Sequence, residues 1–417
     1  MPTVDRTLER PRRLSLASLV APMSLDRFLA EHWEERHLVV RGAAERFGAL
    51  FSFADVDRYL AAAAASPAAK LSVGQAGKGI QTFAVADLDP ARVYAAVASG
   101  STVMLAAIDR FWPPAAELAR ALGEDLLARV KINVYMTPAG FQGAPIHPDI
   151  QDVFVLQLEG RKDWYVYDQR IYEPVETLEH ADLLAPPHVH FEEEPPLAEA
   201  PTLEPGDLLY LPRGQVHRAV APADSPSLRW TVCVTPPYWV ELVKAAAERV
   251  SAEHPELARA LRPGWDRDPA VHRAMREGFE AALRRVAESA SFAAAAELLT
   301  RARQRREAFP ADGHFEQLLR LEEIGLDTVL ERRAGLGCRV EVAGEAASLR
   351  FAASRVKLSA AAAPALEMVR DRVRFAVRDL PEPLSDESRV TLARRLVREG
   401  LLRAELPRRR EPGEDAG

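Results

Sequence analysis

The chain has 417 residues, more than one ordinary hydrophobic core accommodates, so we expect two or three domains. Its 48% hydrophobic and 28% charged residues exclude a largely disordered protein. Its 61 acidic residues outnumber its 54 basic ones, and the formal net charge of -7 excludes a nucleic-acid-binding surface that extends over the whole chain.

Cysteine content and hydropathy bear on the compartment in which the protein works. The two cysteines, Cys233 and Cys338, lie far apart, which excludes a disulfide framework or a zinc cluster and fits a reducing environment. No stretch has the length and apolarity of a membrane span, and residues 1–15 lack the apolar core of a signal peptide. We therefore expect a cytoplasmic protein with no membrane association.

The first 130 residues alternate between helical patterns and short strands. An amphipathic helix is expected after Ser24, which is a suitable N-cap, and a strand is expected at 37–42. Residues 51–65 predict a second helix. The Pro- and Glu-rich residues 178–207 are expected to form a surface excursion.

The pattern changes to β structure between Lys131 and about Pro237. Short apolar runs separated by glycine and proline predict several strands at regular spacing, which is typical of a sandwich or barrel. The predicted strands lie within residues 130–138, 152–160, 162–168, 206–214, 216–222 and 227–236.

The remainder of the chain is mostly helical. Apolar residues three and four apart predict helices within 238–254, 268–288 and 292–309, and helices then alternate with short strands. The predicted organisation is therefore a β-rich domain with an N-terminal helical elaboration at 1–238, a helical region at 239–314, an α+β domain at 315–407 and a disordered tail at 408–417.

Three side chains in the β-rich region have the composition of a metal site. His147 and Asp149 are two residues apart, so an extended strand directs both to one face. His217 follows an apolar strand and a Pro-Arg-Gly turn, and it supplies a third ligand. Two histidines and one carboxylate form the facial triad of non-haem Fe(II) oxygenases, which leaves three coordination positions open.

These residues also carry a resemblance to a known family. Gly206, Pro212, Gly214 and His217 have the spacing of the second cupin motif, and residues 147–168 resemble the iron-binding hairpin of the JmjC-type ribosomal oxygenases, or cupin-4 proteins. The resemblance implies an α+β protein whose core is a double-stranded β-helix, of the cupin or jelly-roll type, with flanking helices. It also implies that the helical region mediates homodimerisation and that the C-terminal domain is winged-helix-like.

In that family a basic residue on the return strand of the hairpin binds the distal carboxylate of 2-oxoglutarate, and Lys162 occupies this place. Lys162 shares one strand face with Trp164 and Val166, and a lysine in such surroundings needs an anionic partner. Three further residues are expected near the co-substrate by resemblance: Asn133, Thr231 and Cys233. Cys233 stands where some members carry serine, which weakens that contact.

The resemblance implies an Fe(II)- and 2-oxoglutarate-dependent enzyme that uses O2 to hydroxylate a protein side chain, specifically an arginine or histidine of a ribosomal protein. No catalytic residue beyond the metal centre is assigned. Direct nucleic-acid binding is not expected, because the C-terminal arginines are interleaved with acidic residues. Hydroxylation and demethylation are not distinguished.

Two other classes remain open at this point. One is a metal-dependent cupin dioxygenase that acts on a small molecule without 2-oxoglutarate, against which Lys162 argues. The other is a non-catalytic dimeric binding module, against which the complete set of metal ligands argues. Dependence on 2-oxoglutarate distinguishes the first alternative, and salt-dependent nucleic-acid binding distinguishes the second.

Overall fold

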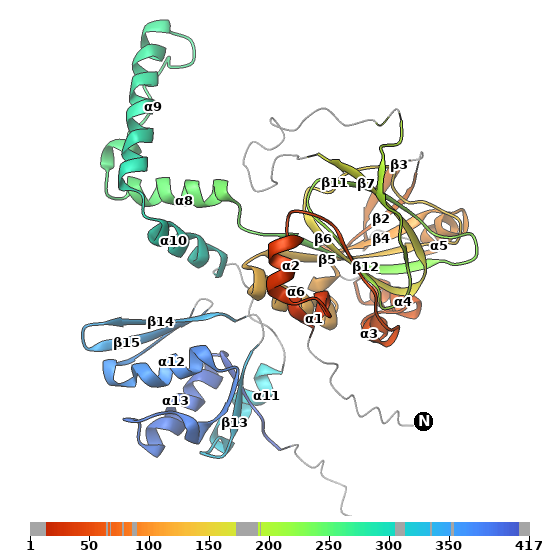
Figure 1. Cartoon of the computed structure of the whole chain (residues 1–417). Helices are drawn as coiled ribbons and strands as arrows, with labels where there is room; N and C mark the ends of the chain where they lie inside the picture. The colour runs from red at the N-terminus through yellow and green to blue at the C-terminus, as the bar shows by residue number, and fades with distance from the viewer. Residues whose placement is uncertain are drawn as a thin grey trace, which may run out of the picture. The chain divides into compact units, whose positions relative to one another are not determined.

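The protein divides into two compact units, Met1–Pro236 and Pro237–Gly417, and each is described by itself. The predicted tail at 408–417 and nearly half of the predicted surface excursion lie outside the described residues. The computed structural model (Figure 1) describes residues 14–63, 66, 68–76, 79–85, 90–171, 191, 193–304, 313–333, 336–351 and 354–407.

Helices cover the outer face of the first unit. Ser24 caps α2 as predicted, because its side chain accepts a hydrogen bond from the backbone N–H of Arg27. The helices are α1 (Leu16–Val20), α2 (Leu25–Glu31), α3 (Glu45–Gly48), α4 (Phe53–Ala63), α5 (Pro90–Ala98) and α6 (Pro113–Leu126), with a 3-10 turn η2 at Ile108–Arg110.

The first unit contains a large antiparallel sheet of eight strands in the order β1-β10-β6-β12-β5-β4-β2-β3. Four of these strands, β1 to β4, lie before residue 107, so that segment extends the sheet. The strands are β1 (Leu38–Val40), β2 (Lys70–Gln75), β3 (Gly79–Ala84), β4 (Thr102–Ala106), β5 (Arg129–Thr137), β6 (Asp152–Gly160), β10 (Leu208–Leu211) and β12 (Ser227–Thr235).

A smaller sheet faces it, in the order β11-β7-β8 with β9 also paired to β7. The two antiparallel sheets with flanking helices confirm the predicted jelly-roll core. The final part of the predicted surface excursion at 178–207 is exposed along β8, but it also forms strands that the sequence did not indicate, because β8 and β9 pair with β7. The strands are β7 (Lys162–Arg170), β8 (Leu197–Glu199), β9 (Thr202–Leu203) and β11 (Gln215–Val220).

Side chains along β12 alternate between the two faces of the large sheet, one of which packs against helices while the other borders a cavity. Leu228, Trp230 and Val232 belong to the core that the sheet shares with the helices. Arg229 and Thr231, on the opposite face, line a cavity. A second apolar cluster includes Val153, Val155, Trp164, Val166 and Leu209 and fills part of the space between the two sheets. The interior of the jelly roll is therefore only partly apolar.

The second unit begins with the helices α8 (Trp239–Ser251), α9 (Pro269–Ser289) and α10 (Phe292–Gln304). Its remainder has two three-stranded sheets, β17-β13-β18 and β14-β15-β16. The dimerisation and winged-helix-like assignments for these parts stay predictions. The elements are α11 (His314–Leu319), β13 (Val329–Arg332), β14 (Cys338–Ala343), β15 (Ala346–Phe351), β16 (Ser354–Ser359), α12 (Ala363–Asp371), β17 (Arg374–Ala376), α13 (Asp386–Arg398) and β18 (Leu402–Ala404).

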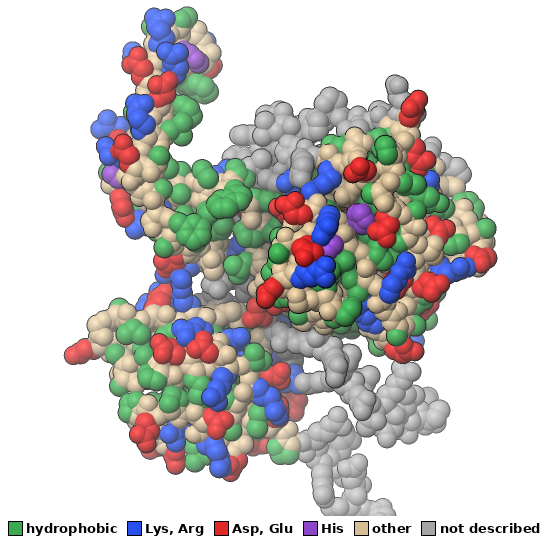
Figure 2. All heavy atoms as spheres, viewed as in Figure 1, with side chains coloured by type: hydrophobic (Ala, Val, Ile, Leu, Met, Phe, Trp, Pro, Cys, Tyr) green, Lys and Arg blue, Asp and Glu red, His purple; other side chains and the backbone are tan. Residues whose placement is uncertain are grey.

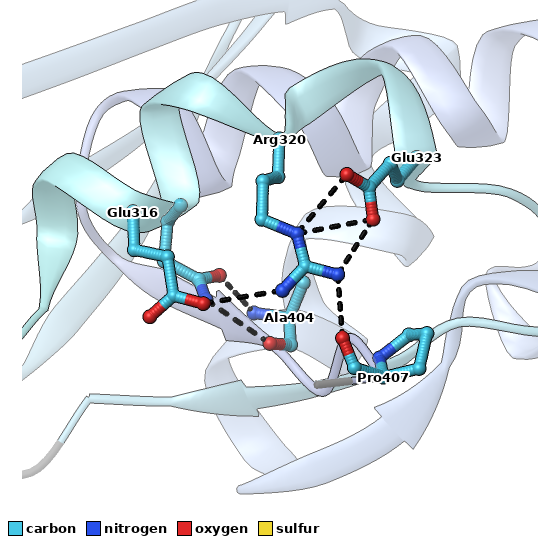
Figure 3. A network of polar contacts seen from close by, with 6 residues as sticks. Glu316, Arg320, Glu323, Ala404 and Pro407 are labelled. Atoms are coloured by element: carbon cyan, nitrogen blue, oxygen red, sulfur yellow. Dashed lines mark hydrogen bonds and ion pairs between the residues drawn. The ribbon is translucent and has the colours of Figure 1, made fainter. Parts of the chain in front are cut away.

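A buried arginine secures α11 to the end of the described chain (Figure 3). The Arg320 guanidinium donates to the carboxylates of Glu316 and Glu323 and, at 2.6 Å, to the carbonyl oxygen of Pro407. Its side chain is only 5% exposed, so these acceptors compensate for removing the charge from water. Within the described residues, no helix is both long and apolar enough to cross a membrane.

The turn between β6 and β7 requires glycine at position 160. Gly160 has a φ of 64°, and a Cβ atom there would collide with the carbonyl oxygen of Pro226. We expect Gly160→Ala to lower the free energy of unfolding by at least about 1 kcal/mol, since an L side chain is unfavourable at this φ and the turn must also shift. Chemical denaturation of the purified variant measures this.

The control for this prediction is Gly278→Ala. Gly278 lies within α9, has no atom within 4 Å of a built Cβ, and should tolerate alanine or be stabilised by it. Equal stability of Gly160→Ala and the wild type would contradict the proposed constraint on the turn.

Candidate metal centre

The backbone brings two histidines that are distant in sequence into direct register. His147 and His217 form an isolated antiparallel bridge, with N–O distances of 3.1 and 3.0 Å between their amides and carbonyls. The expectation of a continuous strand through His147 and Asp149 was wrong. Pro148 has no amide hydrogen to donate, so no strand is formed until β6 begins at Asp152.

The three predicted ligands converge all the same. The Nε2 atoms of His147 and His217 lie 3.8 and 3.7 Å from the two carboxylate oxygens of Asp149. One ligand atom from each residue lies within 4.8 Å of the others. These atoms come from the segment before β6 and from β11, so the bridge between the two segments determines their spacing.

Hydrogen bonds orient both imidazole rings for coordination. Nδ1 of His147 lies 2.8 Å from the carbonyl oxygen of Pro145, and Nδ1 of His217 lies 2.8 Å from that of Gln215. Because a carbonyl oxygen only accepts, each Nδ1 must carry the proton. The lone pair then resides on Nε2, which faces Asp149, and this is the tautomer that metal-binding histidines require.

Burial favours the neutral form of the deeper histidine. His217 is 4% exposed, and burial together with the neighbouring His147 lowers its pKa to about 4, although Asp149 partly opposes this. His217 is therefore neutral near pH 7. Two neutral imidazoles and one carboxylate grouped at one point fit a divalent ion such as Fe(II), and they leave part of its coordination sphere open.

The ligands open into a cavity of about 370 Å³ between the sheets. Its apolar lining includes Val153, Val155 and Trp164, which belong to the inter-sheet cluster. The first third of the chain also contributes to the lining, which the sequence did not indicate. These additional residues are Ser72, Gly74, Thr102 and Met104.

Lys162 faces this cavity, as its position on the return strand predicts. It is 2% exposed, and Trp164 and Val166 on the same strand face are also buried. Burial, and secondarily the nearby Arg229, lower the pKa of Lys162 well below its ordinary value, with a small opposing effect of Asp163. The position is therefore one in which a carboxylate ligand would stabilise the ammonium form.

The other three expected co-substrate residues divide into two groups. Thr231 lines the cavity, and its buried hydroxyl has no hydrogen-bond partner in the part of the chain that the structure describes. Asn133 and Cys233 are not among the lining residues. The Asn133 amide nitrogen lies 3.7 Å from the Cys233 sulfur, and its oxygen accepts from the Ala107 amide at 3.0 Å. Direct contact of these two with a co-substrate stays a prediction.

Sequence reasoning missed Arg229 and Tyr135, which also line the cavity. Both could have been found from strand alternation. Arg229 precedes Thr231 by two residues on β12, and Tyr135 follows Asn133 by two on β5, so each shares a face with a residue that was predicted.

Residues 109–242 match the model of the JmjC domain, and this segment includes the three metal-ligand candidates, the cavity-facing Lys162 and all strands from β5 to β12. Residues 109–242 thus form a JmjC domain, as the sequence resemblance predicts. The match is confined to about the middle third of the chain.

Particular relatives agree with this class. The chain is 35% identical over 218 residues to ribosomal oxygenase 1 of Gallus gallus, covering 51% of this chain and 35% of the relative. It is 30% identical over 261 residues to the bifunctional lysine-specific demethylase and histidyl-hydroxylase NO66 of Dictyostelium discoideum. This alignment covers 61% of this chain and 49% of the relative. The chain therefore spans half or less of the length of these relatives.

The fold also resembles solved structures of a bacterial protein. The ribosomal oxygenase YcfD from Escherichia coli, in complex with cobalt and 2-oxoglutarate, is 20% identical with a TM-score of 0.53, and the alignment covers 92% of this chain and 99% of YcfD. Its complex with cobalt and succinic acid gives a TM-score of 0.54 at 21% identity. These likenesses establish the shared fold.

The convergence of the three ligands predicts a single metal site. We expect the metal-free protein to bind one equivalent of Co(II), with visible absorption bands that His217→Ala and Asp149→Asn abolish, because each removes one ligand. His254→Ala is a matched control, since His254 lies beyond α8 and pairs with Glu256. Unchanged Co(II) spectra in both ligand variants would exclude this site.

Proposed function

We propose that the protein is an Fe(II)- and 2-oxoglutarate-dependent oxygenase that hydroxylates a protein side chain. One observation carries the proposal: the three convergent ligands open into the same cavity as the buried Lys162. A metal site alone fits many cupin chemistries. The buried cation beside it specifically supports an anionic co-substrate, because an unpaired ammonium is costly in an enclosed site.

The chain's own residues have separable tasks in this reaction. His147, Asp149 and His217 would hold the metal on one side, and the bound Fe(II) would supply the chemistry by which O2 oxidises the keto acid and the target C–H bond. Lys162 would pair with the distal carboxylate. Apolar neighbours, including Val155 and Trp164, would limit access of water to the site.

The expected target is a ribosomal-protein arginine or histidine, supported by the relatives named ribosomal oxygenase and histidyl-hydroxylase. Hydroxylation of intact ribosomal proteins is detected by mass spectrometry as a gain of one oxygen atom. The cytoplasmic location stays a prediction.

The co-substrate requirement gives a direct test with the isolated protein. Given Fe(II), 2-oxoglutarate and O2, the wild type should produce succinate and His217→Ala should not. Lys162→Met should raise the 2-oxoglutarate concentration needed for half-maximal rate by about tenfold or more, since it removes a charge-assisted hydrogen bond. A sensitive succinate assay against a no-enzyme blank measures both effects.

Arg161→Met is the control for Lys162→Met. Arg161 is adjacent in sequence but is partly exposed and pairs with Asp224 outside the cavity, so its loss should leave the co-substrate requirement unchanged. Metal binding without 2-oxoglutarate affinity or succinate would instead support the alternative, a cupin dioxygenase that acts on a small molecule.

We also propose that α8, α9 and α10 mediate homodimerisation. Large apolar side chains on these helices remain exposed, and Figure 2 shows hydrophobic side chains gathered over α8. Trp239 and Val243 lie one turn apart on α8, and Phe279 and Leu283 lie one turn apart on α9. Pairs of exposed apolar side chains, one turn apart on amphipathic helices, support an interface between chains.

The dimer prediction is tested by changing one of these pairs. Phe279→Glu combined with Leu283→Glu should convert a dimer to a monomer in light scattering coupled to size-exclusion chromatography, because two carboxylates would be buried in an apolar interface. Leu29→Glu, an equally drastic change at an exposed position of α2, should leave the mass unchanged. A wild-type protein that is monomeric at all concentrations tested would refute the assignment.

A further inference from the structure

The cavity contains a second cation that the proposed chemistry has not used. The Arg229 guanidinium lies between two aromatic rings, with its central carbon 4.8 Å from the ring centre of Tyr135 and 4.6 Å from that of Trp164. Its Nε and Nη1 atoms are buried and have no hydrogen-bond partner among the described residues. The side chain is therefore held by ring stacking while these two nitrogens remain without a partner there.

The local backbone explains why an arginine points inward at this position. Arg229 pairs with Tyr135 on β5 in a register that is unbroken along β12, so Arg229 lies on the same cavity-lining face as Thr231, two residues further on. The register shift against β6 skips Leu158 of that strand and leaves the alternation of β12 intact. Leu228 remains in the helix-covered core, and Arg229 enters the cavity.

Two buried cations in one cavity need an anion. Arg229 contributes to lowering the pKa of Lys162, and burial lowers the pKa of Arg229 itself to about 10, so Arg229 stays charged near pH 7. Trp164 lies two residues from Lys162 on the same face of β7, and it stacks on the Arg229 guanidinium. The two cations thus approach one region of the cavity from facing sheets, β7 and β12.

We propose that Arg229 binds the distal carboxylate of 2-oxoglutarate jointly with Lys162, so that the co-substrate is held by one cation from each sheet. This inference rests on the proposed function. The planar guanidinium presents donors in a fork that matches a carboxylate, whereas the lysine acts as a point charge. A metal held by the three ligands would take the keto-acid end of the co-substrate, which leaves the distal carboxylate for this pair.

Equilibrium binding tests the assignment without catalysis. Full-length protein loaded with Mn(II) is titrated with 2-oxoglutarate or with 2-oxopentanoate, which has the same keto-acid end but no distal carboxylate. Arg229→Met should weaken 2-oxoglutarate binding by about tenfold or more and leave 2-oxopentanoate binding unchanged, because the lost bonds are charge-assisted and involve the distal carboxylate alone. Arg229→Lys should give an intermediate loss.

Two further measurements separate binding from folding. Arg218→Met is the matched control: Arg218 also stacks on a tyrosine, at 3.8 Å from the ring centre of Tyr165, but it does not line the cavity. The thermal midpoint of the ligand-free Arg229→Met protein should equal or exceed that of the wild type, since an unpaired buried charge is removed. If the methionine variant does not fold, Arg229→Gln takes its place in the titration.

The outcomes distinguish the proposal from the function on which it rests. Equal weakening of both keto acids would overturn it by placing Arg229 at the keto-acid end, and unchanged binding of both would overturn it by removing Arg229 from the ligand. Failure of the Mn(II)-loaded wild type to bind 2-oxoglutarate would overturn the proposed function as well. Selective loss of 2-oxoglutarate affinity in Arg229→Met, absent in Arg218→Met, supports the proposal.

Discussion

The candidate site depends on one backbone contact, the antiparallel bridge between His147 and His217. The two residues are far apart in sequence, and neither they nor Asp149 can hold a metal ion unless their segments lie in this register. A slip of one residue would turn His217 to the opposite face of β11. The bridge is in turn supported by pairing of β11 with β7 over most of its length, where His217 lies opposite Val166. Strand pairing, more than any loop, therefore determines the geometry of the ligands.

A second constraint is the presence of charge inside a jelly roll whose walls are partly apolar. Buried guanidinium and ammonium groups are unfavourable, and the buried Nε and Nη1 atoms of Arg229 have no hydrogen-bond partner in the described part of the chain. The arrangement is one in which ligand binding relieves a cost present in the free protein. The stability of the protein and its affinity for the ligand are thus linked at this site, because the charged groups that destabilise the ligand-free cavity also bind the dianion that fills it.

Much of this site could be predicted from the sequence because its signals are local. His147, Asp149 and the turn before His217 have fixed spacing, and Lys162 follows from the two-residue period of a strand that begins after Gly160. The contributions of Ser72, Gly74, Thr102 and Met104 could not be predicted, since they depend on β2 and β4 joining β5 in the large sheet. Nor could the stacking of Arg229 between Tyr135 and Trp164, because it depends on β5 and β7 lying on opposite sides of the cavity.

Charge balance connects the metal, the two cations and the co-substrate. A divalent ion held by Asp149 leaves one net positive charge, and Arg229 adds a second, which together match a dicarboxylate. Lys162 is then in excess as a cation, and its pKa is lowered accordingly by burial and by Arg229. Burial lowers the pKa of Arg229 only to about 10, so Arg229 supplies the permanent charge to which a dianion responds.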